Sequence, residues 1–69
     1  MKKHLRSADV RRALAADSMT AVEIAEWLRM PVDDVMSALG YLRRTMQVRM
    51  CVPISERLYE LTDKGFSML

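Results

Sequence analysis

The 69-residue sequence predicts a mainly α-helical domain of the α+β class, with three helices, a small β-hairpin and a short C-terminal helical turn. Three observations support this fold class. Apolar residues recur at helical spacing in three early segments, two later runs are rich in β-branched and aromatic residues, and capping residues precede helical segments. Because this length provides one modest core, we expect a single domain over residues 1–69, with a flexible basic N-terminus over residues 1–6.

The first helix is predicted over residues 7–16. Ser7 is a suitable N-cap, and Asp9 in the first turn suits the helix dipole. Val10, Ala13 and Leu14 then recur at helical spacing.

The second helix has the strongest start signal in the sequence. Thr20 and Glu23 stand in capping-box register, and Pro31 disfavours a helical conformation at the residue before it, so the helix should end near Arg29. Its predicted apolar face consists of Ala21, Ile24, Trp27 and Leu28. Of these, Trp27 is expected at the margin of the core.

The third helix is predicted over residues 32–45. Its apolar stripe consists of Val35, Ala38, Leu39, Leu42 and Met46. Its opposite face holds Asp33, Ser37, Gly40 and Arg44. A mid-helix glycine costs about 1 kcal/mol relative to alanine, so Gly40 indicates either neutral drift or the close approach of another molecule. We expect the stripe to face inward and to leave the opposite face free.

The runs "QVRMCV" and "RLYELT" around "PISE" predict a β-hairpin. Side chains expected on its inner side are Val48, Met50, Val52, Tyr59 and Leu61. Thr62 then caps a last helical turn, in which Gly65 is expected to limit stability.

Composition favours a binding protein of the cytoplasm. The net charge is +2 and the pI about 9.0, which is only mildly basic. No apolar run approaches the roughly 18 residues that span a bilayer, no signal-peptide pattern is present, and a single cysteine forms no intrachain disulfide. No metal-ligand cluster, nucleophile–base pair or phosphate-binding glycine loop appears. We therefore expect no enzyme activity, no cofactor, no metal and no membrane partner.

Three helices followed by a hairpin, with "TAVEIAEWLRMPVDDVMSALGYLRRTMQV" and "LYELTDKG" in this order, resemble the winged helix-turn-helix DNA-binding domains of small bacterial and phage transcriptional regulators. This resemblance implies that the third helix enters the major groove of double-stranded DNA while the hairpin, or wing, contacts the adjacent backbone. The positions implied near the bases are Asp33, Asp34, Ser37, Tyr41 and Arg44. The positions implied near phosphates are Thr20 and Ala21, through backbone N–H groups, and Arg49 and Arg57 in the wing. The basic N-terminal cluster that would add attraction consists of Lys2, Lys3, Arg6, Arg11 and Arg12.

Asp33 and Asp34 depart from this pattern because they would approach a polyanion. Three explanations for these carboxylates compete. They could simply stabilise the first turn of the helix, by about 0.3–1 kcal/mol each, or accept a hydrogen bond from the cytosine amino group of DNA. Alternatively, the partner of this face is a basic protein and not DNA. The leading prediction is therefore a small DNA-binding transcriptional regulator. The alternative is a protein-interaction winged helix, acting as an antirepressor, inhibitor or assembly subunit through the acidic face of the third helix. Under either hypothesis the protein could act as a monomer or as a homodimer.

Overall fold

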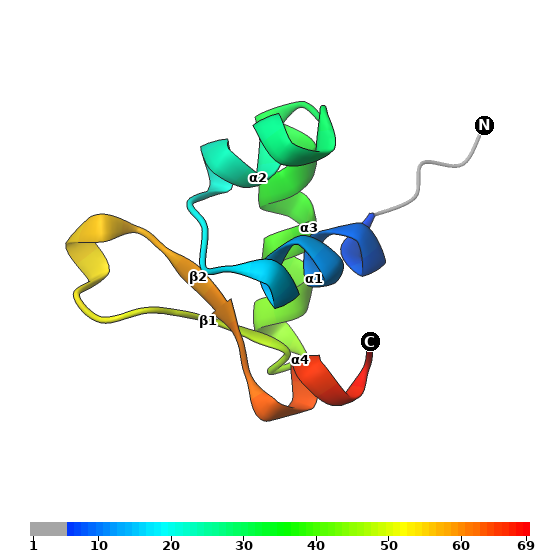
Figure 1. Ribbon diagram of the computed structural model, residues 1–69, viewed down its shortest axis with the longest axis vertical. Helices are drawn as coiled ribbons and strands as arrows, with labels where there is room; N and C mark the ends of the chain where they lie inside the picture. Colours follow the sequence, from blue (N-terminus) through cyan, green and yellow to red (C-terminus); the bar gives the residue numbers. More distant parts are fainter. Residues whose placement is uncertain (1–5) are drawn as a thin grey trace.

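The computed structural model describes residues 6–69, arranged as three helices, a hairpin and a last short helix (Figure 1). The elements are α1 (Ser7–Ala16), α2 (Ala21–Leu28), α3 (Val32–Arg44), β1 (Val48–Met50), a 3-10 turn η1 (Ile54–Glu56), β2 (Tyr59–Leu61) and α4 (Asp63–Ser67). The predicted fold class, with its small hairpin and C-terminal helical turn, is confirmed. The first two helices and α3 pack on one another, and α1 also covers β2.

Helix α1 has the predicted bounds but a different N-cap residue. Ser7 is its first helical residue, and Arg6 is the N-cap without a side-chain capping bond, so the prediction of Ser7 as N-cap is wrong. The Nε of Arg6 donates to Oδ2 of Asp9 at 2.8 Å, an ion pair across the first turn. Val10, Ala13 and Leu14 are buried as predicted.

Helix α2 is fixed at both ends by local hydrogen bonds. The capping box of Thr20 and Glu23 is present in both directions. At the other end Arg29 is left-handed, and the Met30 N–H donates to the Ala25 carbonyl at 3.0 Å, which forms a Schellman motif. The expectation that Trp27 packs at the margin of the core is wrong, because its side chain is 62% exposed. In this eight-residue helix only Ile24 and Ala25 are buried, so the buried face does not extend to Trp27.

The left-handed Arg29 gives a direct stability test. Its φ of 56° is unfavourable for a residue with a Cβ, whereas glycine adopts it freely. We therefore expect Arg29→Gly to raise the free energy of unfolding by about 1 kcal/mol, measured by urea denaturation. Arg29→Ala is the control, since it removes the same charge and keeps the Cβ. Equal stability of the two variants would contradict this explanation.

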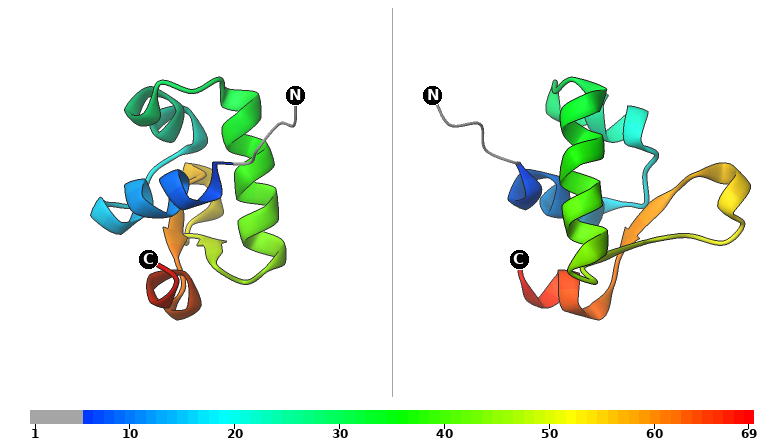
Figure 2. Two further views of the ribbon diagram at one scale, coloured as in Figure 1. Left: turned by 90° about the vertical axis from the view of Figure 1, so that its right-hand side faces the viewer. Right: turned by 180° about the vertical axis from the view of Figure 1, so that it is seen from behind.

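Helix α3 forms the back of the molecule and carries much of the core (Figure 2). Val35, Ala38, Leu39 and Leu42 are buried, as the apolar stripe predicts. Met46 is 68% exposed, so its assignment to the stripe is wrong. The helix ends before it, and the left-handed Met46, with φ 65°, turns the chain so that the next residue, Gln47, is buried instead.

The hairpin joins the helices through a strand-like contact at Met19. Strands β1 and β2 are antiparallel, with Val48 opposite Leu61 and Met50 opposite Tyr59, and the Met19 backbone pairs with Tyr59 on the other side of β2. The predicted inner face is therefore confirmed along the paired strands. Val52 is the exception, because it lies in the wing beyond the paired strands and is 90% exposed.

Helix α4 starts at the predicted cap. Thr62 accepts from the Gly65 N–H at 3.1 Å, and its own hydroxyl donates to the Met46 carbonyl at 2.6 Å. Gly65 is buried against the backbone of Gln47, and a Cβ added to it would lie 2.1 Å from the Gln47 carbonyl oxygen. The absence of a side chain at Gly65 therefore permits this packing, contrary to the expectation that the glycine weakens the turn.

Candidate nucleic-acid interface

The outer face of α3 is exposed along its length. Asp33, Ser37 and Arg44 are exposed, and Gly40 is half-buried between the last two. A Cβ on Gly40 would meet only the Nη1 of Arg44, at 3.7 Å, so no packing within the protein requires glycine there. In the view from behind, α3 lies foremost with the wing extending to one side (Figure 2). The structure thus brings most of the predicted α3 residues together on one accessible face.

Asp34 and Tyr41 lie beside this face. They are seven residues apart and therefore share one flank of α3, while Val32 and Met36 line the groove that faces the wing on the other flank. Asp34 is half-buried, and Tyr41 is 38% exposed. Asp34 and Tyr41 therefore lie at the edge of the exposed outer face of α3 and not at its centre.

Two arginines end α3. Arg43 and Arg44 occupy its last turn, where positive charge suits the negative end of the helix dipole. Both are exposed, and neither forms an ion pair within residues 6–69. Together with Gly40 they line a shallow depression of about 420 Å³. Arg43 lies seven residues after Met36 and therefore on the flank of α3 that faces the wing.

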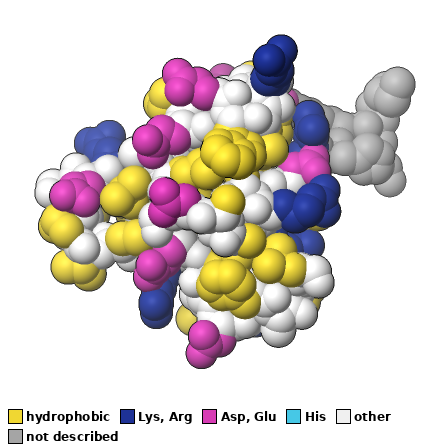
Figure 3. All heavy atoms as spheres, viewed as in Figure 1, with side chains coloured by type: hydrophobic (Ala, Val, Ile, Leu, Met, Phe, Trp, Pro, Cys, Tyr) yellow, Lys and Arg dark blue, Asp and Glu magenta, His cyan; other side chains and the backbone are white. Residues whose placement is uncertain are grey.

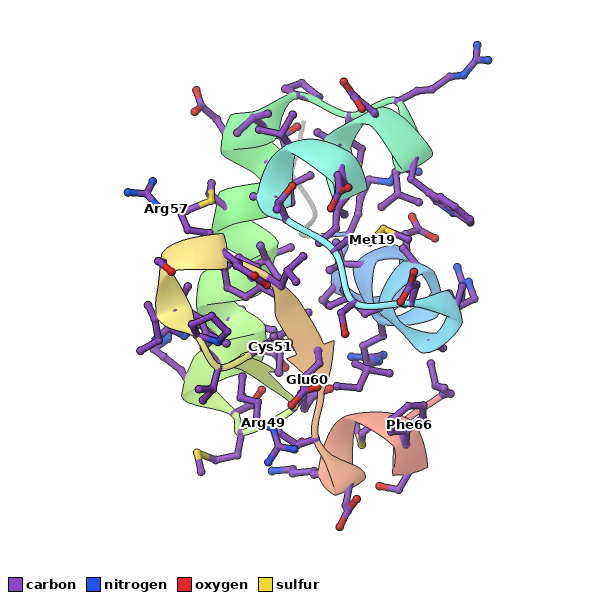
Figure 4. The ribbon with its side chains drawn as sticks, turned by 60° about the vertical axis from the view of Figure 1, so that its left-hand side comes forward. Met19, Arg49, Cys51, Arg57, Glu60 and Phe66 are labelled. Carbon is purple, nitrogen blue, oxygen red and sulfur yellow. The ribbon has the colours of Figure 1, made fainter. Side chains whose placement is uncertain are left out.

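The two wing arginines differ in their surroundings. Arg49 on β1 donates from Nε to Oε2 of Glu60 on β2 at 2.6 Å, and the two side chains meet in Figure 4. This hydrogen bond, with a smaller contribution from Cys51, holds the pKa of Glu60 below its usual value. Arg57 is exposed, points outward from the wing (Figure 4) and has no ion pair in the part of the chain that the structure describes. Arg57 is therefore the wing's available cation.

The described members of the predicted basic N-terminal cluster, Arg6, Arg11 and Arg12, each bond another side chain of the protein. Lys2 and Lys3 lie outside the described residues. Arg6 and Arg12 both bond the Asp9 carboxylate, and the Arg6 hydrogen bond is the main cause that lowers the pKa of Asp9.

Arg11 points inward rather than toward a partner. Its Nη1 donates to Oε1 of the buried Gln47 at 2.8 Å, and its Nε is buried without a hydrogen bond. Gln47 also donates from Nε2 to the Thr45 hydroxyl at 2.7 Å. Sequence reasoning missed this network, because its two ends are 36 residues apart and no local pattern connects them.

The N-terminus of α2 offers fewer free donors than predicted. The Thr20 N–H donates to Oε1 of Glu23 at 2.8 Å within the capping box, so it is already used. The N–H of Ala21 belongs to the first turn, where no intrahelical acceptor exists. Of the two predicted phosphate donors, Ala21 is the one whose backbone is available.

No protein-family model, curated protein or solved structure matches this chain. Within residues 6–69 no helix has the length and apolar character needed to cross a membrane, and no group of three metal-ligating side chains gathers in a way that could hold a metal ion. The candidate interface therefore rests on its geometry and charge.

Proposed function

We propose that this protein binds double-stranded DNA and regulates transcription by occupying its site, without catalysing a reaction. The observation that carries this proposal is the exposed outer face of α3, together with Arg43 and Arg44 in the last turn of that helix, neither of which has an ion pair within the described residues. The major groove of B-DNA is wide enough to admit an α-helix, and unpaired arginines supply both base and phosphate contacts.

The arrangement of charge indicates how α3 would lie. Its C-terminal half would contact phosphates and guanine edges through Arg43 and Arg44, with Gly40 allowing close approach of the backbone. Arg57 on the wing would reach a neighbouring phosphate. At the other end of α3, Asp33 would accept a hydrogen bond from the cytosine amino group, which selects sequence more than it adds affinity.

The test is the salt dependence of binding to a fluorescently labelled random duplex, starting at about 50 mM salt, where nonspecific attraction is strong. We expect the double variant R43Q/R44Q to weaken binding and to reduce the slope of log K against log salt by about 2, because each lost phosphate contact removes about one unit.

The matched control is the double variant R6Q/R12Q, which removes the same formal charge from arginines that are held by Asp9. It should change the slope less than R43Q/R44Q does. Failure of the wild-type protein to bind duplex DNA at about 50 mM salt, or equal effects of the two double variants, would refute the proposed interface.

A further inference from the structure

A groove separates the wing from the α2–α3 pair. It has a volume of about 620 Å³ and is lined by Thr20, Ala21, Val22, Val32, Met36, Met50, Ile54, Ser55, Glu56, Arg57 and Tyr59. Aliphatic side chains from three elements converge there, because the flank of α3 that carries Val32 and Met36 faces the inner side of the hairpin. Its floor is Met50 and Tyr59, which are held by the register of β1 and β2.

Much of this apolar surface is exposed to water. Val22 is 54% exposed, Met36 47% and Ile54 65%, and Val52, two residues before Ile54 in the wing tip, is 90% exposed. Hydrophobic side chains gathered on the wing are visible in Figure 3. Contiguous apolar surface of this kind marks protein-interaction sites more often than it occurs by chance on a monomer. A small ligand inside the groove would leave the wing tip uncovered, whereas a peptide segment would cover both.

The charges around the groove favour a cationic partner. Glu56 lines it, and Glu23 and Asp33 lie about 100° around α2 and α3 from the lining residues Val22 and Val32, on the faces next to the groove. None of these three carboxylates has an ion pair within residues 6–69, and Arg57 is the only cation in the lining. Acidic side chains border the hydrophobic surface near the wing in Figure 3. Carboxylates repel phosphate groups and aliphatic side chains do not bind them, so the groove itself is unsuited to nucleic acid.

We propose that this groove docks a protein segment that presents aliphatic side chains flanked by lysine or arginine. Such a segment would bury the exposed groove residues and place its cations beside Glu23, Asp33 and Glu56. The groove does not include Arg43 and Arg44, which carry the proposed DNA contact, although Arg57 and Asp33 belong to both surfaces. The docking does not depend on DNA binding.

The methionines provide built-in probes for a test by NMR. Met36 and Met50 line the groove, whereas Met46 and Met68 do not. The protein would be labelled with 13C-methyl methionine and titrated with a designed helical peptide of leucine and lysine, then with the same peptide carrying glutamate in place of lysine. We expect the lysine peptide to shift the methyl signals of Met36 and Met50 selectively, and the glutamate peptide to bind at least about tenfold more weakly.

Ile54→Lys is the deciding variant, and Phe66→Lys is its matched control. Both side chains are more than half exposed, so both variants should fold, which circular dichroism checks. Phe66 lies on α4, away from the wing (Figure 4). We expect Ile54→Lys to weaken binding of the lysine peptide by about tenfold or more and Phe66→Lys to leave it unchanged.

Three outcomes would overturn the docking proposal. They are no shift of Met36 and Met50 at about 1 mM peptide, equal shifts of all exposed methionines, or equal binding by the two lysine variants. Since Ile54→Lys adds a positive charge, it should not reduce DNA binding, so failure of docking and failure of the DNA-binding proposal are distinguishable.

Discussion

Gly65→Ala is expected to lower the free energy of unfolding by about 3 kcal/mol, the upper end of the usual cost of overpacking. The added Cβ would lie 2.1 Å from the Gln47 carbonyl oxygen and 3.0 Å from a methyl group of Leu61. Because the first of these atoms belongs to the backbone, α4 must move away or the chain after α3 must shift. Urea denaturation followed by circular dichroism measures the effect.

Gly40→Ala is the control for that experiment, because it adds the same methyl group at a position where the protein leaves room for it. Its Cβ would touch only the flexible end of Arg44, at 3.7 Å. Alanine is the better helix former by about 1 kcal/mol, so this variant should gain stability. If both variants shift the midpoint in the same direction, the packing explanation for Gly65 fails.

Gln47→Leu is expected to cost about 2 kcal/mol although it nearly preserves side-chain volume. The substitution removes the acceptor of the Arg11 guanidinium and the donor to Thr45, and it leaves charged N–H groups partly buried without a partner. Gln47 is 2% exposed, so water compensates poorly at this position. Thermal and urea unfolding give the change in stability.

A double-mutant cycle with Arg11→Met separates this hydrogen-bond network from general packing. If the Arg11–Gln47 bond carries the effect, the double variant should lose less stability than the two single variants together, by about 1 kcal/mol. Strict additivity of the two substitutions would show that the hydrogen bond from Arg11 to Gln47 contributes nothing of its own to stability.

The helices could be predicted because their signals are local. The capping box of Thr20 and Glu23, the Thr62 cap and the apolar stripe of α3 are each encoded within one or a few turns, and all three are present in the structure. The face opposite the stripe could be predicted by the same periodicity, and it is exposed as expected.

The failed predictions involve contacts that no local pattern records. Helical periodicity was extended one turn too far at Met46, because nothing in the sequence marks the left-handed residue that places Gln47 in the core. The charge of the interface was misjudged for a similar reason. A formal count treats Arg49 like Arg57, whereas strand register pairs Arg49 with Glu60 and leaves Arg57 without an ion pair within residues 6–69.

The tip of the wing has a further practical consequence. All side chains from residue 52 to residue 57 are exposed, and the backbone hydrogen bonds from Glu56 to Pro53 and from Arg57 to Ile54 stay within this loop. Exposed loops held only by their own contacts accept inserted sequence well. A short epitope or fluorophore tag placed between Ser55 and Glu56 should therefore leave the three-helix core intact, and it offers a way to report on the wing from within the folded chain.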